Sequence, residues 1–232
     1  MSEGEERRRM VRPPTGGDGG RTSSARLKTA EGRTPSSQRW LERQINDPYV
    51  QRTQAEGWRS RAAFKLIEID DRFRLIRPGA RVIDLGAAPG GWVQVALKRG
   101  AAAVVGVDLL PIDPIPGSEL IQADFTDPGV GERLVGLLGG RPTLVLSDMA
   151  QNTVGHQRTD HLKIVALIEA AAAFAIEVLP PGGAFVTKNF QGGSAGEVLG
   201  ELKRSFAEVK HVKPKASRQD SAEVYLVATG RR

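Results

Sequence analysis

The feature that most constrains the fold is a regular alternation of strand-like and helix-like segments through most of the 232-residue chain. Short runs rich in Val, Ile and Leu predict strands, and segments with helical periodicity lie between them. The clearest helical segment ends at a Pro-Pro-Gly-Gly sequence. This alternation predicts βαβ units and therefore an α/β fold, with a parallel sheet covered by helices on both faces. The strand candidates are 81–86, 103–108, 120–124, 143–148 and 184–189, and the clearest helix is 160–179.

Two further strand candidates near the C-terminus have a different connection. They cover residues 207–212 and 222–230 and follow a predicted helix near 196–206. The few residues between the two strands cannot form another helical crossover. We therefore expect these strands to pair as an antiparallel hairpin.

Two helices are predicted in front of the alternating region. Ser36 or Ser37 is expected to cap a short helix that stops before Pro48. Ser60 is expected to cap a stronger helix over 60–73, where apolar residues recur near helical spacing.

The first 35 residues differ in composition from the rest of the chain. Sixteen of them are Gly, Pro, Ser or Thr, and eight Arg or Lys stand against five Asp or Glu. Such a segment cannot bury enough apolar surface to offset its ordering entropy, so we predict a disordered basic tail over 1–35. It is either a solvated leader or an arm that contacts phosphate. We expect one folded domain over 36–232.

The composition excludes several classes of protein. A net charge of +6 indicates a polyanionic partner such as nucleic acid. The absence of cysteine excludes disulfides and a cysteine nucleophile. The five-residue separation of His156 and His161 is not that of a zinc-binding helix, so we expect no metal. No apolar run suits a membrane span and no secretory signal is present, so we expect a cytoplasmic protein, acting as a monomer.

A glycine-rich turn, VIDLGAAPGGW over 82–92, follows the first predicted strand and opens a helix. Doubly wound sheets bind ligands at this position, beyond the carboxyl ends of the strands. Gly86, Gly90 and Gly91 would let the backbone approach a ligand that a Cβ atom would block. Ala88 replaces the second glycine of a dinucleotide fingerprint and no Gly-Lys-Ser/Thr follows, so neither that site nor a P-loop is indicated.

Acidic residues end the next predicted strands. Asp108 ends the second strand and could accept hydrogen bonds from both hydroxyls of a ribose. Asp124 ends the third strand and suits the exocyclic amine of a base. With the glycine turn, these acids fit a nucleoside ligand that carries little phosphate, and S-adenosylmethionine is such a ligand. Asp148 would lie on the same rim, and Trp92 would either fill the core or flank the cofactor.

The sequence also excludes several kinds of methyl acceptor. Methylation of a pyrimidine C5 uses a cysteine nucleophile, which the chain lacks. Enzymes that methylate amino groups typically carry Asp/Asn-Pro-Pro-aromatic after the fourth strand, where this chain reads SDMAQN. Methylation of an oxygen remains, and it requires help in removing a hydroxyl proton.

Lys188 is an unusual residue for the apolar strand in which it stands, because lysine is rarely buried without a partner. Parallel strands end on one rim of the sheet, so Asp148 and Lys188 are expected to meet there. Glu223 starts the last predicted strand, and Lys65 lies on the helix before the first. These two ammonium groups and two carboxylates form a candidate catalytic set.

From about Ser36 to the C-terminus, the chain resembles the FtsJ/RrmJ family of ribose 2′-O-methyltransferases. The resemblance implies a Rossmann-like, mostly parallel sheet of seven strands with one antiparallel strand, and S-adenosylmethionine bound at the glycine turn. It also implies catalytic roles for Lys65, Asp148, Lys188 and Glu223. The segments that carry it are RSRAAFKL, DLGAAPGGW, VVGVDLLPIDPI, DFTD, SDMA, PGGAFVTKNFQG and SAEVYLVATG.

Similarity to the bacterial members of this family implies a particular substrate, the ribose of a uridine in the A-loop of 23S rRNA in the large ribosomal subunit. Gln151 and Asn189 depart from the residues usual in those members, outside the four catalytic positions. Alternative substrates are the tRNA anticodon loop and the mRNA cap. A protein of another class, a non-catalytic ribosome-assembly factor that binds RNA, is the remaining alternative. The basic residues expected to present RNA are Arg59, Arg61, Lys213, Lys215 and Arg218.

Overall fold

The computed structural model describes residues 34, 37–38, 41–42, 45–149, 157–190, 196–218 and 221–232. The chain divides into two units, Met1–Gly57 and Trp58–Arg232. The second unit starts at Trp58, later than the domain expected over 36–232. The start of that domain at residue 36 stays a prediction. The predicted tail, apart from Thr34, and the positions Ser36 and Gln151 lie outside the described residues.

In the first unit, Pro48 begins a helix, α2 (Pro48–Glu56), that sequence analysis did not predict. The side chain of Asp47 caps this helix by accepting a hydrogen bond from the backbone N–H of Tyr49 at 3.0 Å. Proline suits the first position of a helix because the N–H that it lacks would have no partner within the helix. The sequence pattern predicts only a helix that stops before Pro48.

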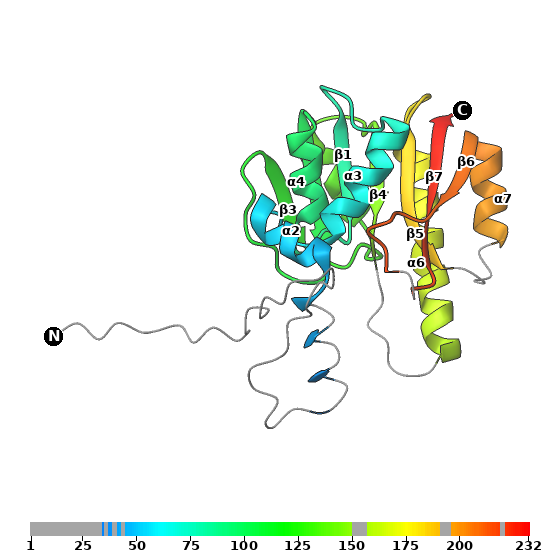
Figure 1. The fold of residues 1–232 in the computed structure, drawn as a ribbon. Coiled ribbons are helices and arrows are strands. Elements are labelled where there is room, and N and C mark those ends of the chain that lie inside the picture. Colours follow the sequence, from blue (N-terminus) through cyan, green and yellow to red (C-terminus); the bar gives the residue numbers. More distant parts are fainter. Residues whose placement is uncertain are drawn as a thin grey trace. The chain divides into compact units, whose positions relative to one another are not determined.

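The second unit contains a seven-stranded sheet in the order β3-β2-β1-β4-β5-β7-β6 (Figure 1). Strands β1 to β5 pair in parallel, and β7 is antiparallel to both of its neighbours, β5 and β6. This confirms the predicted α/β sheet with one antiparallel strand and the predicted C-terminal hairpin. The strands are β1 (Arg81–Leu85), β2 (Ala103–Asp108), β3 (Ser118–Gln122), β4 (Leu144–Ser147), β5 (Ala184–Phe190), β6 (Phe206–Val212) and β7 (Glu223–Arg231).

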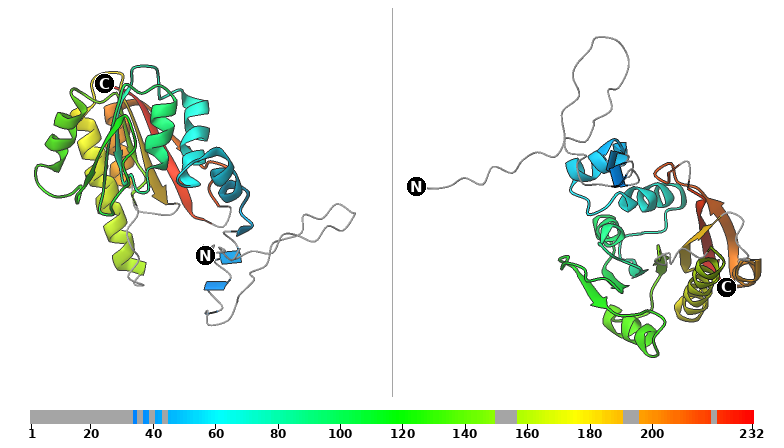
Figure 2. Two further views of the ribbon diagram at one scale, coloured as in Figure 1. Left: turned by 90° about the vertical axis from the view of Figure 1, so that its left-hand side faces the viewer. Right: turned by 90° about the horizontal axis from the view of Figure 1, so that it is seen from below.

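Helices cover both faces of the sheet, as Figure 2 shows from the side and from below. Alternate residues of a strand point to opposite faces, so Val82 packs with the helices on one face and Ile83 with those on the other. The first face carries α3 (Ala62–Phe73) and α4 (Gly91–Lys98). The second carries α5 (Val130–Leu138), α6 (Gln157–Val178) and α7 (Gly196–Ser205). No helix in the described part of the chain is long and apolar enough to span a membrane.

Both ends of α3 differ from a standard capped helix. The prediction that Ser60 caps this helix was wrong, because the N-cap is Arg61 and no side-chain hydrogen bond caps the end. The Ser60 hydroxyl is instead buried, with no hydrogen-bond partner among the described residues. At the other end Arg74 adopts the left-handed conformation, with φ at 52°, and its backbone N–H donates to the carbonyl of Asp70.

Candidate active site

The alternation of side chains along β5 and β7 brings the candidate catalytic residues to one face of the sheet. Lys188 pairs with Tyr225 in the antiparallel register, and Val186 pairs with Val227. Val186, Tyr225 and Val227 pack on the face covered by α3 and α4. Side chains two residues apart share a face, so Lys188 and Glu223 lie on it too.

The Lys188 ammonium group has a carboxylate partner, which explains how a lysine is tolerated in this strand. Its Nζ donates to the Asp148 carboxylate at 3.0 Å and to the Asp148 backbone carbonyl at 2.6 Å. The Lys188 residue is only 7% exposed. A buried charge without a partner would be costly. The two bonds to Asp148 therefore both stabilise Lys188 and fix the position of its Nζ.

A second ion pair joins α3 to the start of β7. The Nζ of Lys65 lies 2.9 Å from each carboxylate oxygen of Glu223. Glu223 also accepts a hydrogen bond from the Ser217 hydroxyl at 2.8 Å. The Lys65 Nζ is 3.9 Å from the nearer Asp148 oxygen, so the two ion pairs are adjacent. The structure thus brings Lys65, Asp148, Lys188 and Glu223 together; we call these four residues the charged cluster.

Tyr225, which sequence analysis did not select, connects the two ion pairs. Its hydroxyl donates to the Asp148 carboxylate at 2.7 Å and accepts from the Lys65 Nζ at 3.1 Å. Burial raises the pKa of the Tyr225 phenol well above its usual value, and the charges of Asp148 and Glu223 raise it further. The hydroxyl therefore stays protonated and remains a donor to Asp148. The available signal was its position two residues after Glu223 in a strand, hence on the same face.

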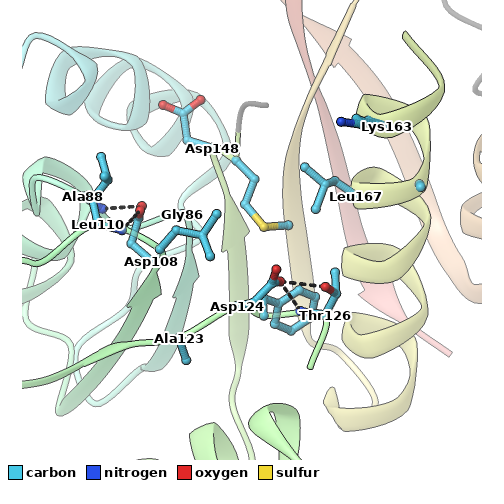
Figure 3. Close-up of a pocket in the computed structure, with 14 residues that line it drawn as sticks. Gly86, Ala88, Asp108, Leu110, Ala123, Asp124, Thr126, Asp148, Lys163 and Leu167 are labelled. Atoms are coloured by element: carbon cyan, nitrogen blue, oxygen red, sulfur yellow. Dashed lines mark hydrogen bonds between the residues drawn. The ribbon is translucent and has the colours of Figure 1, made fainter. Parts of the chain in front are cut away.

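A cavity of about 510 Å³ has Asp148 of the charged cluster in its lining (Figure 3). Asp148 lines this cavity as well as binding Lys188, so the two features share one carboxylate. The cavity lies between the carboxyl ends of the strands and α6, from which Lys163 and Leu167 project (Figure 3). Its volume falls within the roughly 300–1,000 Å³ typical of small-molecule sites.

Two further predicted acids, besides Asp148, line this cavity. Asp108 ends β2, and its carboxylate accepts hydrogen bonds from the backbone N–H groups of Ala88 and Leu110, both at 2.9 Å. Asp124 lies in the loop after β3, because that strand ends at Gln122, two residues earlier than predicted. The hydroxyl and backbone N–H of Thr126 donate to Asp124 and lower the pKa of its carboxyl. The acid therefore stays ionised as a hydrogen-bond acceptor.

The glycine turn reaches the cavity through Gly86 and Ala88. Gly86 has a φ of 80°, and a Cβ atom there would lie 2.9 Å from the backbone of Met149. A Cβ atom at Gly90, where φ is 105°, would approach the Ile115 side chain to 2.6 Å. Among the described residues that line the cavity, neither Gly90 nor Trp92 is included. Trp92 is buried in the core, where its indole N–H donates to the Ala62 carbonyl.

Asp84 is a buried acid beneath the glycine turn. Its residue is 1% exposed, and neither carboxyl oxygen has a hydrogen-bond partner among the described residues. Burial raises the pKa of the Asp84 carboxyl well above its usual range, and the charges of Asp148 and Asp108 raise it further. No role for Asp84 was predicted from the sequence. A buried polar group without a partner is unusual in a protein interior.

The cavity has the features that S-adenosylmethionine requires. Its carboxylates can accept hydrogen bonds from hydroxyl and amine donors. The buried Asp84, whose carboxyl has no partner among the described residues, is near enough to Asp108 and Asp148 for their charges to raise its pKa. Apolar side chains that were not predicted as site residues provide walls for a flat base. They come from separate loops and from α6. They are Leu109, Leu110, Phe125, Met149 and Leu167. No three His, Asp or Glu side chains gather as a metal site in the part of the chain that the structure describes.

The basic residues expected to present RNA have varied surroundings. The Arg59 guanidinium donates to the carbonyls of Pro89, Asp113 and Pro114, so it braces the glycine turn. Arg61 donates to the Ala216 carbonyl and, with Arg218, lines a small polar pocket next to Lys65 and Glu223. The Lys213 ammonium donates to the Ser221 carbonyl, and Lys215 is exposed.

A seven-stranded sheet with a reversed last strand and a cavity at the strand ends is the architecture of a Rossmann-like methyltransferase. Residues 58–231 match the family model described as FtsJ-like methyltransferase, and the chain belongs to this family. The family resemblance inferred from the sequence is therefore confirmed.

Relatives with assigned names are similar over almost the whole chain. A protein of Caulobacter vibrioides is 64% identical over 222 residues, which cover 95% of this chain and 98% of that protein. One from Granulibacter bethesdensis is 61% identical, covering 95% of this chain and 94% of the other. Both are named ribosomal RNA large subunit methyltransferase E. A Plasmodium falciparum structure described as a ribosomal RNA methyltransferase matches with a TM-score of 0.66 and 30% identity, over 75% of this chain and 98% of the other.

Proposed function

We propose that this protein methylates the ribose 2′-hydroxyl of a uridine in the A-loop of 23S rRNA in the large ribosomal subunit, with S-adenosylmethionine as methyl donor. The names of the relatives support large-subunit ribosomal RNA as the substrate class. The uridine and the A-loop come from the family resemblance. The non-catalytic assembly factor is disfavoured, because a binding module has no use for two partly buried ion pairs beside a cavity.

The observation that carries the proposal is the double role of Asp148. Its carboxylate lines the cavity and also holds the Lys188 Nζ at 3.0 Å. A methyl group delivered from the cavity would therefore arrive next to the lysine that accepts the hydroxyl proton. Catalysis of this kind depends mainly on holding the reacting groups in line.

The charged cluster supplies the proton chemistry. Lys188, in its neutral form, accepts the proton of the ribose 2′-hydroxyl on Nζ. Asp148 orients that Nζ through its carboxylate and backbone carbonyl. Lys65 stabilises the negative charge that develops on the ribose oxygen, and both oxygens of Glu223 hold Lys65 in place. Tyr225 positions Asp148 and Lys65 relative to each other.

The cavity residues bind and orient the methyl donor. Asp108 accepts hydrogen bonds from its ribose hydroxyls and Asp124 from its base amine, while Gly86 leaves space for the backbone to approach. Gly90 and Trp92 act less directly, by shaping the turn and holding it against α3. When bound, S-adenosylmethionine supplies a methyl group on a positively charged sulfur. The apolar wall excludes water from that group.

Incubation with labelled S-adenosylmethionine and undermodified large ribosomal subunits tests the proposal. We expect label in 23S rRNA, and mapping should place it on the ribose of one A-loop uridine. Total tRNA and capped mRNA serve as competing substrates in parallel reactions. Label in either of these, or at a base atom instead of the ribose, would contradict the assignment.

A further inference from the structure

A second hollow lies at the opposite end of the sheet from the charged cluster. Its volume of about 790 Å³ exceeds that of the cavity. Ala184, in its wall, and Lys188 are four residues apart on β5, or about 13 Å along the strand. The C-terminal end of β7 also lies here, as Figure 1 shows. We call it the basic groove, after its cationic residues Arg72, Arg74, Arg77 and Lys210.

The charge of the basic groove is strongly unbalanced. All four cationic residues are exposed to solvent. The only acid among the described residues that line the groove is Glu208, which forms an ion pair with Lys210 at 2.7 Å. The three arginines are therefore not neutralised within the groove. They stand within six residues of sequence, at the end of α3 and in the loop that follows.

The loop that carries these arginines is firmly held. Asp70, 2% exposed, accepts the backbone N–H of Arg74 on its carbonyl and that of Ile76 on its carboxylate, both at 2.8 Å. The other carboxylate oxygen of Asp70 lies 3.3 Å from the Arg99 guanidinium. Arg74 keeps its left-handed conformation, which is unfavourable for a residue other than glycine. A loop fixed in this way presents its charges without a large entropic cost on binding.

The floor of the basic groove suits the close approach of another chain's backbone. It consists largely of glycine, proline and alanine, including Gly79, Gly182 and Gly183. A Cβ atom at Gly79 or Gly182 would meet nothing within 4 Å, so the floor is open there. The Arg72 guanidinium lies 5.0 Å from the centroid of the half-buried Phe73 ring, which limits its freedom.

We propose that the basic groove binds the sugar–phosphate backbone of a second RNA segment, distinct from the nucleotide that is methylated. The inference rests on the proposed function, because it takes ribosomal RNA as the partner. Arginine presents a planar fork of N–H donors that matches phosphate oxygens. The groove is at the end of the strands remote from the charged cluster, so only a large folded RNA can reach both. An acidic peptide is the competing occupant.

A triple variant that removes three positive charges from the groove tests this proposal. It combines Arg72→Gln, Arg74→Gln and Arg77→Gln, and we call it the groove variant. The matched control removes three exposed cations elsewhere, through Arg133→Gln, Arg141→Gln and Lys203→Gln. Affinity for large-subunit rRNA is measured across a range of salt concentrations. The groove variant should bind roughly 10–100-fold more weakly near 0.1 M salt, with a salt slope shallower by about two to three, because each lost phosphate contact removes about 0.7–0.9 from the slope. The control should resemble the wild type.

Two further measurements separate the possible outcomes. A short A-loop hairpin, too small to reach the groove, should bind the groove variant and the wild type equally. Calorimetry with S-adenosylmethionine and thermal unfolding should show an intact fold. An unchanged rRNA affinity and salt slope in the folded groove variant would overturn the proposal, as would a polyglutamate peptide that binds the groove without competing with rRNA. Wild-type protein that binds rRNA through the groove but methylates none would overturn only the proposed function.

Discussion

The cavity and the charged cluster share Asp148 but are assembled in different ways. In the cavity, Asp108 and Asp124 each accept a backbone N–H from a residue two positions further along the chain. In the charged cluster, Lys188 and Tyr225 are 40 and 77 residues from Asp148 in the sequence, and Lys65 is 158 residues from Glu223. The cavity acids are therefore set largely by local loops, whereas the cluster depends on strand register and on the docking of α3.

Replacing Lys188 should have the largest effect, because it disrupts the charged cluster while leaving the cavity intact. Lys188→Ala should lower the turnover of methyl transfer about 10²–10⁴-fold, the range for loss of a general base. Binding of S-adenosylmethionine, measured by calorimetry, should be nearly unchanged, because the cavity acids keep their local partners. Lys203→Ala, on the exposed side of α7, is the control. Near wild-type turnover in Lys188→Ala would remove the proposed role of this residue.

A substitution at Gly86 should have the opposite effect and disrupt the cavity rather than the charged cluster. Gly86→Ala places a Cβ atom 2.9 Å from the Met149 backbone at a φ of 80°. We expect S-adenosylmethionine to bind about 10–100-fold more weakly, since the turn must move. Gly79→Ala is the matched control, with a similar φ of 85° and no atom within 4 Å of the added carbon. Equal cofactor affinity in the two variants would show that the turn does not shape the site.

A smaller change tests how the two ion pairs are joined. Tyr225→Phe removes a hydroxyl donor to Asp148, and turnover should fall about tenfold, the value of one hydrogen bond to a charged group. The KM for rRNA should be unchanged. A fall in turnover without a change in KM would separate a role at the charged cluster from a loss of substrate binding. Wild-type turnover in Tyr225→Phe would contradict this role.

The smallest effect is expected at Asp84. Its carboxyl has a raised pKa, so the folded protein binds more protons than the unfolded chain above pH 3.8. Stability therefore falls as pH rises from the unfolded value toward the folded one. Asp84→Asn should remove this fall and raise the free energy of unfolding at pH 7 by about 1 kcal/mol. Chemical denaturation at pH 4 and pH 7 measures the free energy of unfolding, and Asp113→Asn, at an exposed position, is the control. A lower free energy of unfolding in Asp84→Asn than in the wild type at pH 7 would contradict the expectation.

The comparison also explains what the sequence could predict. The acids of the cavity belong to a strand–turn–helix pattern that can be recognised in the amino-acid sequence. Two signals in the sequence predict the charged cluster. One is a lysine, Lys188, within an apolar strand, and the other is the family resemblance. Tyr225 was missed because tyrosine is ordinary in a strand, and its role appears only when β7 lies beside β5. Lys163 and Leu167 reach the cavity through the packing of α6, which no local pattern encodes.

The position of β7 between β5 and β6 has a consequence for the order in which the fold assembles. This strand carries Glu223 and Tyr225, and it lies later in the sequence than the other six strands of the sheet. Until it inserts beside β5, Lys65 lacks the carboxylate that holds it, and Asp148 lacks the phenol. The charged cluster is therefore complete only after β7 has joined the sheet, whereas the loops that place Asp108 and Asp124 come earlier in the chain.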